Sequence, residues 1–329
     1  MQNPAKFTDT LLKYNILLML AVLLVASSLL SDAFFTSQNA FNLLRQLAPL
    51  MLVSIGMLLV ILTGGIDLSV GSVAAVGGMI VALALPALSF GGPFGLLVSV
   101  LAALVVGLLL GAVTGIFVSI FRMAPFIASL AMMTIARGLA YLVSNGQPVR
   151  FPRDLSSAQL LTAFGSKGAP GIGLPWPVVL TILVVAAFYV IMKNTTYGRL
   201  TVATGSNEMA VRLAGISEVK YKFLAYFICG GLSALAGVIA TSRAGVGTPV
   251  TGVGLELDAI AACVIGGALL SGGKGTVINT IIGVIILGLI GNIMNLLSVP
   301  AYPQQIIKGA IIVMAVLMQS VGSGRSIRI

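Results

Sequence analysis

The sequence predicts an all-α, polytopic membrane protein, and two observations carry this prediction. First, 58% of the 329 residues are hydrophobic and only 8% are charged, a balance far from that of a soluble domain. Second, apolar runs near the roughly 20 residues that a bilayer crossing needs recur from about residue 14 to about residue 319. Little sequence is left for a separate soluble domain. We therefore expect residues 1–329 to form one transmembrane domain with a core at about 14–319.

The helix boundaries follow from the Gly, Pro and charged residues that interrupt the apolar runs. The first run is flanked by Lys6 and Lys13. It has no small-residue cleavage site before Phe34, so we expect a retained helix and not a signal peptide. About ten helices are predicted, at about 14–33, 44–63, 68–89, 95–120, 125–144, 175–192, 222–242, 256–271, 276–297 and 303–319.

Two stretches depart from this pattern. Residues 145–174 contain three prolines and several glycines, a composition typical of an irregular loop. The segment at 256–271 has only 16 residues, fewer than a full crossing needs. Its Gly-Gly pair at 266–267 could break it into a half-helix.

The basic residues predict the orientation in the membrane. The net charge of +10 comes from side chains scattered singly between apolar runs, which argues against a nucleic-acid partner. If both termini are cytoplasmic, the inside loops and tails hold eleven Lys and Arg residues and the outside loops hold five. Short loops rich in Lys and Arg stay in the cytoplasm, so this orientation is favoured. Arg137 and Lys308 remain within helices, and Arg137 is expected to face protein or water.

The two halves of the chain have similar motifs. Asp67, in LTGGIDLSVG, and Asp258, in LELDAIAACVIGG, each open an apolar run that reaches a Gly-Gly pair. The next helix carries regularly spaced glycines in both halves, namely Gly107, Gly111 and Gly115, then Gly283, Gly288 and Gly291. The following helix starts at Pro125 or Pro303. The pattern predicts an inverted repeat of helices two to five and seven to ten, with chance resemblance as the alternative.

These repeat motifs are interpreted as structural. The motif residues are Gly65, Asp67, Ser69, Gly71 and Asp258. An aspartate at a helix N-terminus is stabilised by roughly 0.3 to 1 kcal/mol, so capping is preferred over substrate binding or proton relay for both aspartates. Small residues at every fourth position let helices approach closely, so the glycine rows indicate packing.

The chain offers no catalytic or metal chemistry of its own. It has no histidine, and Cys229 and Cys263 both lie in apolar runs, where packing is the expected role. The stretch LSGGKGT at 270–276 looks like an ATPase signature, but it lies between two membrane segments and lacks the phosphate-loop pattern. We expect a tight turn there and no cofactor. Any ATP must be hydrolysed by another protein.

Three stretches carry a family resemblance: LVILTGGIDLSVGSVAAVGG, GLELDAIAACVIGGALLSGGKGT and TTYGRLTVATGSNEMAVRLAGIS. The chain resembles the membrane permease subunits of bacterial ribose-type ABC importers. That resemblance implies a multi-pass protein of the bacterial inner membrane that is surrounded by membrane lipid and moves a sugar or sugar-like solute. It also implies a second permease subunit in a homodimer or heterodimer, a periplasmic solute-binding protein and a cytoplasmic ABC ATPase. A self-sufficient secondary transporter and a membrane scaffold protein are the alternatives. The absence of an acidic residue at mid-depth in the predicted helices disfavours the first of these.

The loop at about 193–221 is the expected site of ATPase coupling. By the resemblance, it contains a loose form of the importer motif Glu-Ala-Ala-x3-Gly. Within 204–216 we expect a short helix that Ser206 or Asn207 caps, with an apolar stripe of Met209, Leu213 and Ile216. This stripe fills a groove on the ATPase or, alternatively, packs against the permease's own helix ends. The candidate coupling residues are Glu208, Met209, Ala210, Arg212, Leu213 and Gly215, with Glu208 and Arg212 spaced to form a pair.

The solute path should be lined by weakly polar groups, because a sugar must enter and leave without being held. The candidates are Asn42, Gln46, Asn292 and Asn295. Amides exchange hydrogen bonds with hydroxyls at a net cost of about 1 kcal/mol each. Hydrogen bonding between helices is the alternative role for these amides.

Overall fold

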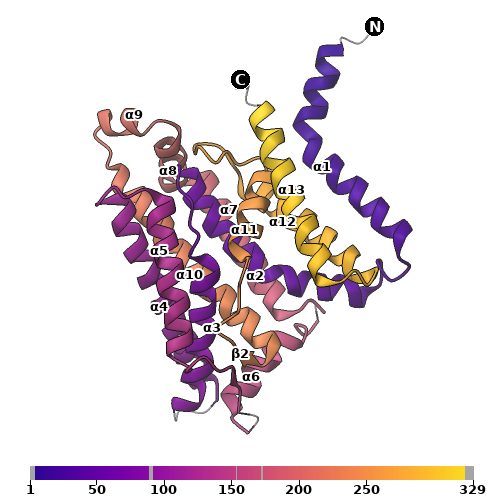
Figure 1. Cartoon of the computed structure of the whole chain (residues 1–329), viewed down its shortest axis with the longest axis vertical. Coiled ribbons are helices and arrows are strands. Elements are labelled where there is room, and N and C mark those ends of the chain that lie inside the picture. Colours follow the sequence, from indigo (N-terminus) through magenta and orange to yellow (C-terminus); the bar gives the residue numbers. More distant parts are fainter. Residues whose placement is uncertain (1–3, 89–91, 153, 172, 323–329) are drawn as a thin grey trace.

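Most of the chain is helical in the computed structural model, which describes residues 4–88, 92–152, 154–171 and 173–322 (Figure 1). The helices of the first half are α1 (Pro4–Leu30), α2 (Ser37–Leu62), α3 (Val70–Ala87), α4 (Gly92–Ser119), α5 (Pro125–Leu142) and α6 (Ser156–Ser166). Those of the second half are α7 (Trp176–Asn194), α8 (Thr196–Ser206), α9 (Glu208–Leu213), α10 (Glu218–Ala244), α11 (Leu255–Ile265), α12 (Val277–Leu296) and α13 (Ala301–Gly322). The short antiparallel strands are β1 (Val149–Arg150) and β2 (Val246–Gly247).

Seven of the described helices are long and apolar enough to cross a membrane: α2, α3, α4, α5, α7, α10 and α12. They coincide with predicted segments, so the prediction of a helical, multi-pass membrane protein is confirmed. Helix α2 starts earlier than predicted because the side chain of Thr36 caps it by accepting the N–H of Asn39. Helix α13 starts at Ala301, two residues before the predicted Pro303, since proline is tolerated in a first helical turn.

Helix α11 is a half-helix, as its sequence suggested. It has 11 residues, far fewer than a bilayer crossing needs. The backbone turns at Gly267, where φ is +82°, a conformation that a residue with a side chain rarely adopts. The chain then runs through a turn at 266–276 into α12.

The expectation of an irregular loop over 145–174 is wrong in part. Helix α6 lies within this interval, and its residues Ala158 and Leu161 are buried against the bundle. All three prolines of the interval lie outside α6, so they bound the helix without interrupting it. The strand β1 also lies here, and it pairs with β2 after α10.

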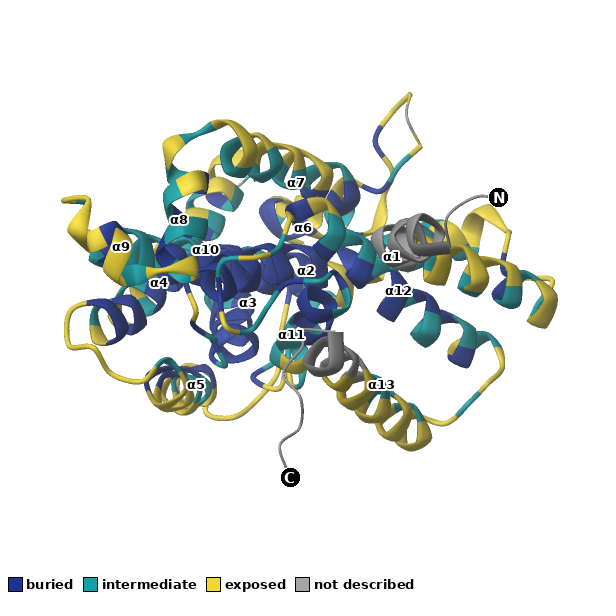
Figure 2. Cartoon of the chain, turned by 90° about the horizontal axis from the view of Figure 1, so that it is seen from above, coloured by how far each residue is buried: buried dark blue, intermediate teal, exposed yellow. Residues whose placement is uncertain are grey.

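Helices α2 and α10 form the centre of the bundle. Figure 2 shows the buried residues gathered on these two helices and on α3, whereas α5, α7 and α13 are largely exposed. Helix α10 packs against α2, α3 and α4, and α2 packs against α10, α11 and α12. Cys229 and Cys263 are buried free thiols within this core, so their predicted packing role is confirmed.

The glycine row of α4 lies against α10. A Cβ atom on Gly111 would collide with the carbonyl oxygen of Tyr226 and would lie 3.1 Å from the Cα of Gly230. Gly107 faces Gly230 and Ala234 of α10 in the same way. The predicted packing role of this row is therefore confirmed, because the two backbones touch without intervening side chains.

The glycine row of α12 is less uniform. Gly283 faces the backbone of α11, where a Cβ atom would collide with the carbonyl of Ala262. Gly288 faces the side chain of Leu47 on α2, and Gly291 has open space where a side chain would lie. Only part of this row therefore serves a close backbone contact.

Asp67 stabilises the turn between α2 and α3. Its carboxylate accepts the backbone N–H of Ser69 at 2.9 Å and the hydroxyl of Ser69 at 2.6 Å. Ser69 is the N-cap residue of α3, so Asp67 acts just before the helix and not on its first turn. Gly65 and Gly71 leave room for Tyr226 and for the loop before α11, where a Cβ atom would collide with the carbonyl of Gly252.

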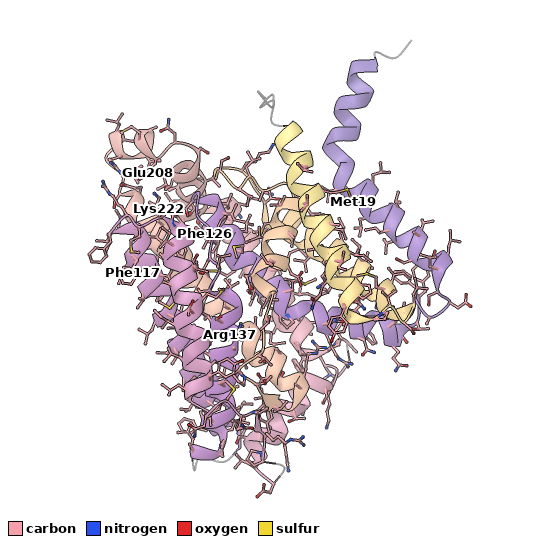
Figure 3. All side chains as sticks on the ribbon, viewed as in Figure 1. Met19, Phe117, Phe126, Arg137, Glu208 and Lys222 are labelled. Atoms are coloured by element: carbon pink, nitrogen blue, oxygen red, sulfur yellow. The ribbon has the colours of Figure 1, made fainter. Side chains whose placement is uncertain are left out.

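Two cations within predicted helices contact protein. Arg137 on α5, labelled in Figure 3, donates hydrogen bonds to the carbonyls of Pro249 and Thr251 in the loop before α11. This confirms the expectation that Arg137 does not face lipid alone. Lys308 on α13 forms an ion pair with Asp258 on α11, with 2.9 Å between Nζ and Oδ2. Asp258 lies in the first turn of α11, as predicted. Its pairing with Lys308 was not predicted from the sequence.

Candidate functional site

The predicted coupling loop folds as two short helices, α8 and α9, at one end of the bundle (Figure 1). The short helix predicted within 204–216 is α9. The extended backbone of Asn207 separates it from α8, a helix that the sequence analysis did not predict. Asn207 caps α9, and its side chain accepts the N–H of Ala210 at 2.9 Å. Helix α9 ends at Leu213, and the chain then turns at Gly215, where φ is +76°.

Ion pairs attach α9 to the start of α10. The predicted pair between Glu208 and Arg212 is present, with 3.1 Å between the charged atoms. Arg212 also contacts Glu218, and Lys222 approaches Glu208 to 2.6 Å. Figure 3 shows Glu208 and Lys222 at this end of the molecule. The sequence analysis missed Glu218 and Lys222 because this pairing joins two helices whose relative position no local spacing reveals.

The apolar stripe of α9 is uncovered in this chain. The side chains of Met209 and Leu213 are 59% and 82% exposed. Val211, on the other face of α9, is buried. Ile216 lies beyond the end of the helix and is partly buried, so the stripe consists of Met209 and Leu213. The alternative that these two side chains pack against the permease's own helix ends is therefore not supported.

A cavity of about 270 Å³ with several charged lining residues lies beside α9. It is bounded by the turn between α2 and α3 and by the turn between α4 and α5. Charged residues of both signs line it, namely Arg122, Glu208, Glu218 and Lys222. These two turns and the start of α10 thus meet next to α9.

The stretch LSGGKGT forms a tight turn that contacts this region. The N–H of Gly273 donates to the carbonyl of Leu62 at 3.0 Å, and the hydroxyl of Ser206 donates to the carbonyl of Gly273 at 3.4 Å. A Cβ atom on Gly205 would collide with the same Leu62 carbonyl. The turn therefore connects α2, the end of α8 and the start of α12 through their backbones.

Asn292, one of the solute-path candidates, joins two helices. Its side chain and that of Asn39 exchange two hydrogen bonds, at 3.1 and 2.8 Å, between α12 and α2. Asn292 is buried. The interhelical role that we considered for this residue accounts for its contacts.

The other three path candidates are exposed in the single chain. Asn42 accepts a hydrogen bond from Arg45, and Asn295 accepts one from Gln304 at 2.9 Å. Gln46 lies one turn from Asn42 on α2 and is also exposed. The structure does not gather all four candidates into one site. Among the described residues, no three His, Cys, Asp or Glu side chains are grouped so as to hold a metal ion.

Known proteins resemble this chain over nearly its whole length. Residues 39–316 match the protein family described as "Branched-chain amino acid transport system / permease component". The chain is 43% identical to the ribose import permease protein RbsC of Escherichia coli K12 over 311 residues, which cover 94% of each chain. It is 39% identical to RbsC of Bacillus subtilis over 325 residues, covering 96% and 95%. It is 36% identical to the L-arabinose transport system permease protein AraH of Escherichia coli K12 over 305 residues, covering 93% and 89%. No solved structure matches it.

The membrane-spanning bundle and its exposed helix at one end define a multi-pass transport subunit of the bacterial inner membrane. The relatives are permease subunits of importers and not ATPases, so the chain is a transport subunit and not an enzyme. The chain belongs to the branched-chain amino acid transport system permease family.

Proposed function

We propose that this chain forms the solute path of an ATP-driven importer that takes up a sugar. The support is the near-full-length identity to permeases named for ribose and L-arabinose. Pentoses are therefore the first solutes to test. A periplasmic binding protein delivers the sugar, and a separate cytoplasmic ATPase hydrolyses ATP. The identity of the sugar bound by the cognate binding protein tests this part of the proposal directly.

The proposed topology has ten membrane segments arranged as an inverted repeat. The pairing of α2 to α5 with α10 to α13 is supported by their contacts. Helix α10 packs on α3 and α4, and α2 packs on the corresponding helices α11 and α12. The beginning of α1 and the end of α13 lie at the same end of the bundle as α8 and α9 (Figure 1). We assign this end to the cytoplasm because the basic residues favour it.

The function also requires a second permease subunit, either identical or related. Support comes from α5 and α13, whose apolar side chains, such as Phe126, Ile127 and Ile306, are exposed. Asn42, Gln46 and Asn295 remain candidates to line the path, since each is exposed and exchanges hydrogen bonds readily. Crosslinking of single cysteines placed on α5 and α13 tests this arrangement.

The coupling role of α9 rests on one observation: Met209 and Leu213 are exposed on a helix that ion pairs hold firmly. A helix of six residues is too short to be stable alone, so these ion pairs with α10 fix its position. A fixed helix with two exposed apolar anchors fits a groove on a partner protein. We assign that partner as the ATPase. Movement of α9 would then pass through Lys222 and Glu218 into α10, the central helix of the bundle.

Leu213→Glu tests this assignment. A charge in place of a buried apolar anchor should cost several kcal/mol, at least about 2, at the contact, so ATPase co-purification and transport should both be lost. The permease itself should still insert, because Leu213 contacts little of its own chain. The matched control is Val253→Glu, which adds the same charge at a residue 73% exposed in the loop before α11, outside α8 and α9. Unchanged ATPase binding in Leu213→Glu would refute the coupling role.

A further inference from the structure

Apart from the cavity beside α9, a groove lies on the outside of the bundle, between the end of α7, the start of α8 and the first turns of α10. Its volume is about 440 Å³. Its apolar wall consists of Phe188, Ile191, Leu224 and Ile228, each of which is partly buried. Figure 2 shows α7 and α8 on the side of α2 and α10 opposite to α5 and α13. A partner subunit bound to α5 and α13 would therefore leave this groove uncovered.

The groove changes from polar to apolar along its length. Lys220 lies at the start of α10, and Ile228 lies eight residues further on, a distance of about 12 Å along a helix. The rings of Tyr197 and Tyr221 lie 6.2 Å apart at the polar end. Tyrosine is enriched where a membrane protein passes from lipid headgroups to acyl chains. The order of these residues thus matches the order of headgroup and acyl chain in one leaflet.

The polar end of the groove is positively charged. Lys220 is exposed and, within the described part of the chain, makes no ion pair or hydrogen bond. Its neighbour Lys222 is paired with Glu208. No carboxylate lines the groove, and the adjoining stretch from Lys193 to Asn207 contains basic residues but no acidic one. The ammonium group of Lys220 is therefore available to bind an anion.

We propose that this groove binds a phospholipid with an anionic headgroup. Lys220 contacts the phosphate, and an acyl chain lies along Phe188, Leu224 and Ile228. The inference rests on the proposed orientation, which puts this end of α10 on the cytoplasmic side, where basic pockets between membrane helices are suited to such headgroups. A cytoplasmic protein could cover Lys220 but could not reach Ile228, which lies two helical turns inside the membrane segment. The bound lipid would stabilise the junction of α7, α8 and α10, and α8 leads from this junction to α9.

Quenching of tryptophan fluorescence by brominated lipids tests the proposal. The only tryptophan, Trp176, is replaced by phenylalanine, and Phe188→Trp places the reporter in the groove. The permease is reconstituted in phosphatidylcholine vesicles that contain brominated phosphatidylglycerol or brominated phosphatidylcholine. We expect phosphatidylglycerol to be preferred about fivefold, the factor that corresponds to about 1 kcal/mol for one lysine near an anionic headgroup. Lys220→Met should reduce this preference to about one.

The matched control is Lys274→Met, which removes an exposed lysine from the turn before α12, outside the groove. It should retain the fivefold preference. Equal quenching by both lipids in the parent protein, or equal loss of preference in both lysine variants, would overturn the proposal. Absence of quenching by either lipid would show that protein fills the groove, and that also overturns it. If Phe188→Trp does not fold, Ile228→Trp serves as the reporter, and native mass spectrometry of the purified permease reports retained phosphatidylglycerol independently.

Discussion

The contact of α4 with α10 and the contact of α12 with α2, which the proposed inverted repeat would relate, differ in closeness. Helix α10 presents Gly230 and Ala234 to the glycines of α4, so the two backbones touch. Helix α2 presents the larger Leu47 to Gly288. A row of small residues permits close approach, but the facing residues decide whether it occurs.

The looser contact, between α12 and α2, is joined by hydrogen bonds between side chains and not by a close approach of the two backbones. The amides of Asn39 and Asn292 join α2 to α12. The second half also contains the half-helix α11, which ends in a turn with several positive φ angles. We therefore expect the α3, α4 and α10 side to be the more resistant to local opening, and the following substitutions compare the two sides.

The largest effect is expected at Gly111. Gly111→Leu would force α4 away from α10, at a cost of about 3 kcal/mol, so less folded permease should be recovered from the membrane. Gly291→Leu is the matched control on α12, where the side chain would enter open space. Thermal unfolding in detergent and recovery by size-exclusion chromatography measure both. Equal tolerance of the two leucines would show that the contact of α4 with α10 does not require glycine at position 111.

Gly111 and Gly291 also show what the sequence can and cannot predict. Composition and the length of the apolar runs were sufficient to place the long helices, because a lipid environment demands long runs of apolar residues. The tight turn at 270–276 and the half-helix α11 also followed, since glycines and segment length are visible locally. That Gly111 would touch α10 while Gly291 would touch nothing could not be predicted, because it depends on the helix on the other side.

For the candidate coupling site at α9, local features were predicted and contacts with other helices were not. The cap at Asn207 and the pair of Glu208 with Arg212 are local and were confirmed. The contacts of Glu218 and Lys222 with α9 were not expected, because a turn of unknown geometry separates the two helices. Helix α8 was missed, since its sequence TYGRLTVATGS is rich in Thr and Gly, which are poor helix formers.

The aspartates of the two similar sequence motifs, Asp67 and Asp258, provide a second comparison. Asp67 is 1% exposed and accepts two hydrogen bonds from Ser69, whereas Asp258 is partly exposed and paired with Lys308. Asp67→Leu leaves the Ser69 N–H buried without an acceptor, which should cost about 1 to 3 kcal/mol. Asp258→Leu removes a partly exposed ion pair and should cost less than about 1 kcal/mol. Chemical or thermal unfolding of both variants in detergent measures the difference, and a larger loss at Asp258 would contradict this ranking.

The pH dependence of stability should report on Asp67. Burial raises the pKa of Asp67 above its ordinary value of 3.8, and the hydrogen bonds from Ser69 oppose this only in part. The folded protein therefore holds this proton more tightly than the unfolded chain does. Stability should fall as the pH rises from about 4 through the raised pKa, and Asp67→Asn, which keeps the acceptor, should flatten the curve. An unchanged curve in Asp67→Asn would show that Asp67 does not titrate in this range.

The smallest effect is expected at the amide pair that joins α2 to α12. Asn292→Ala removes both hydrogen bonds with Asn39, and interhelical hydrogen bonds in membranes average about 0.6 kcal/mol and reach about 1.7. Asn39→Ala should cost a similar amount, and the double variant should cost little more than either single variant, because both remove the same contact. Thermal unfolding of the three variants gives the coupling energy, and transport in vesicles with the ATPase shows whether the pair has a further role. Additive losses from the two single variants would mean that Asn39 and Asn292 act independently. A loss of transport in Asn292→Ala without a loss of stability would place Asn292 on the solute path and not in the helix contact.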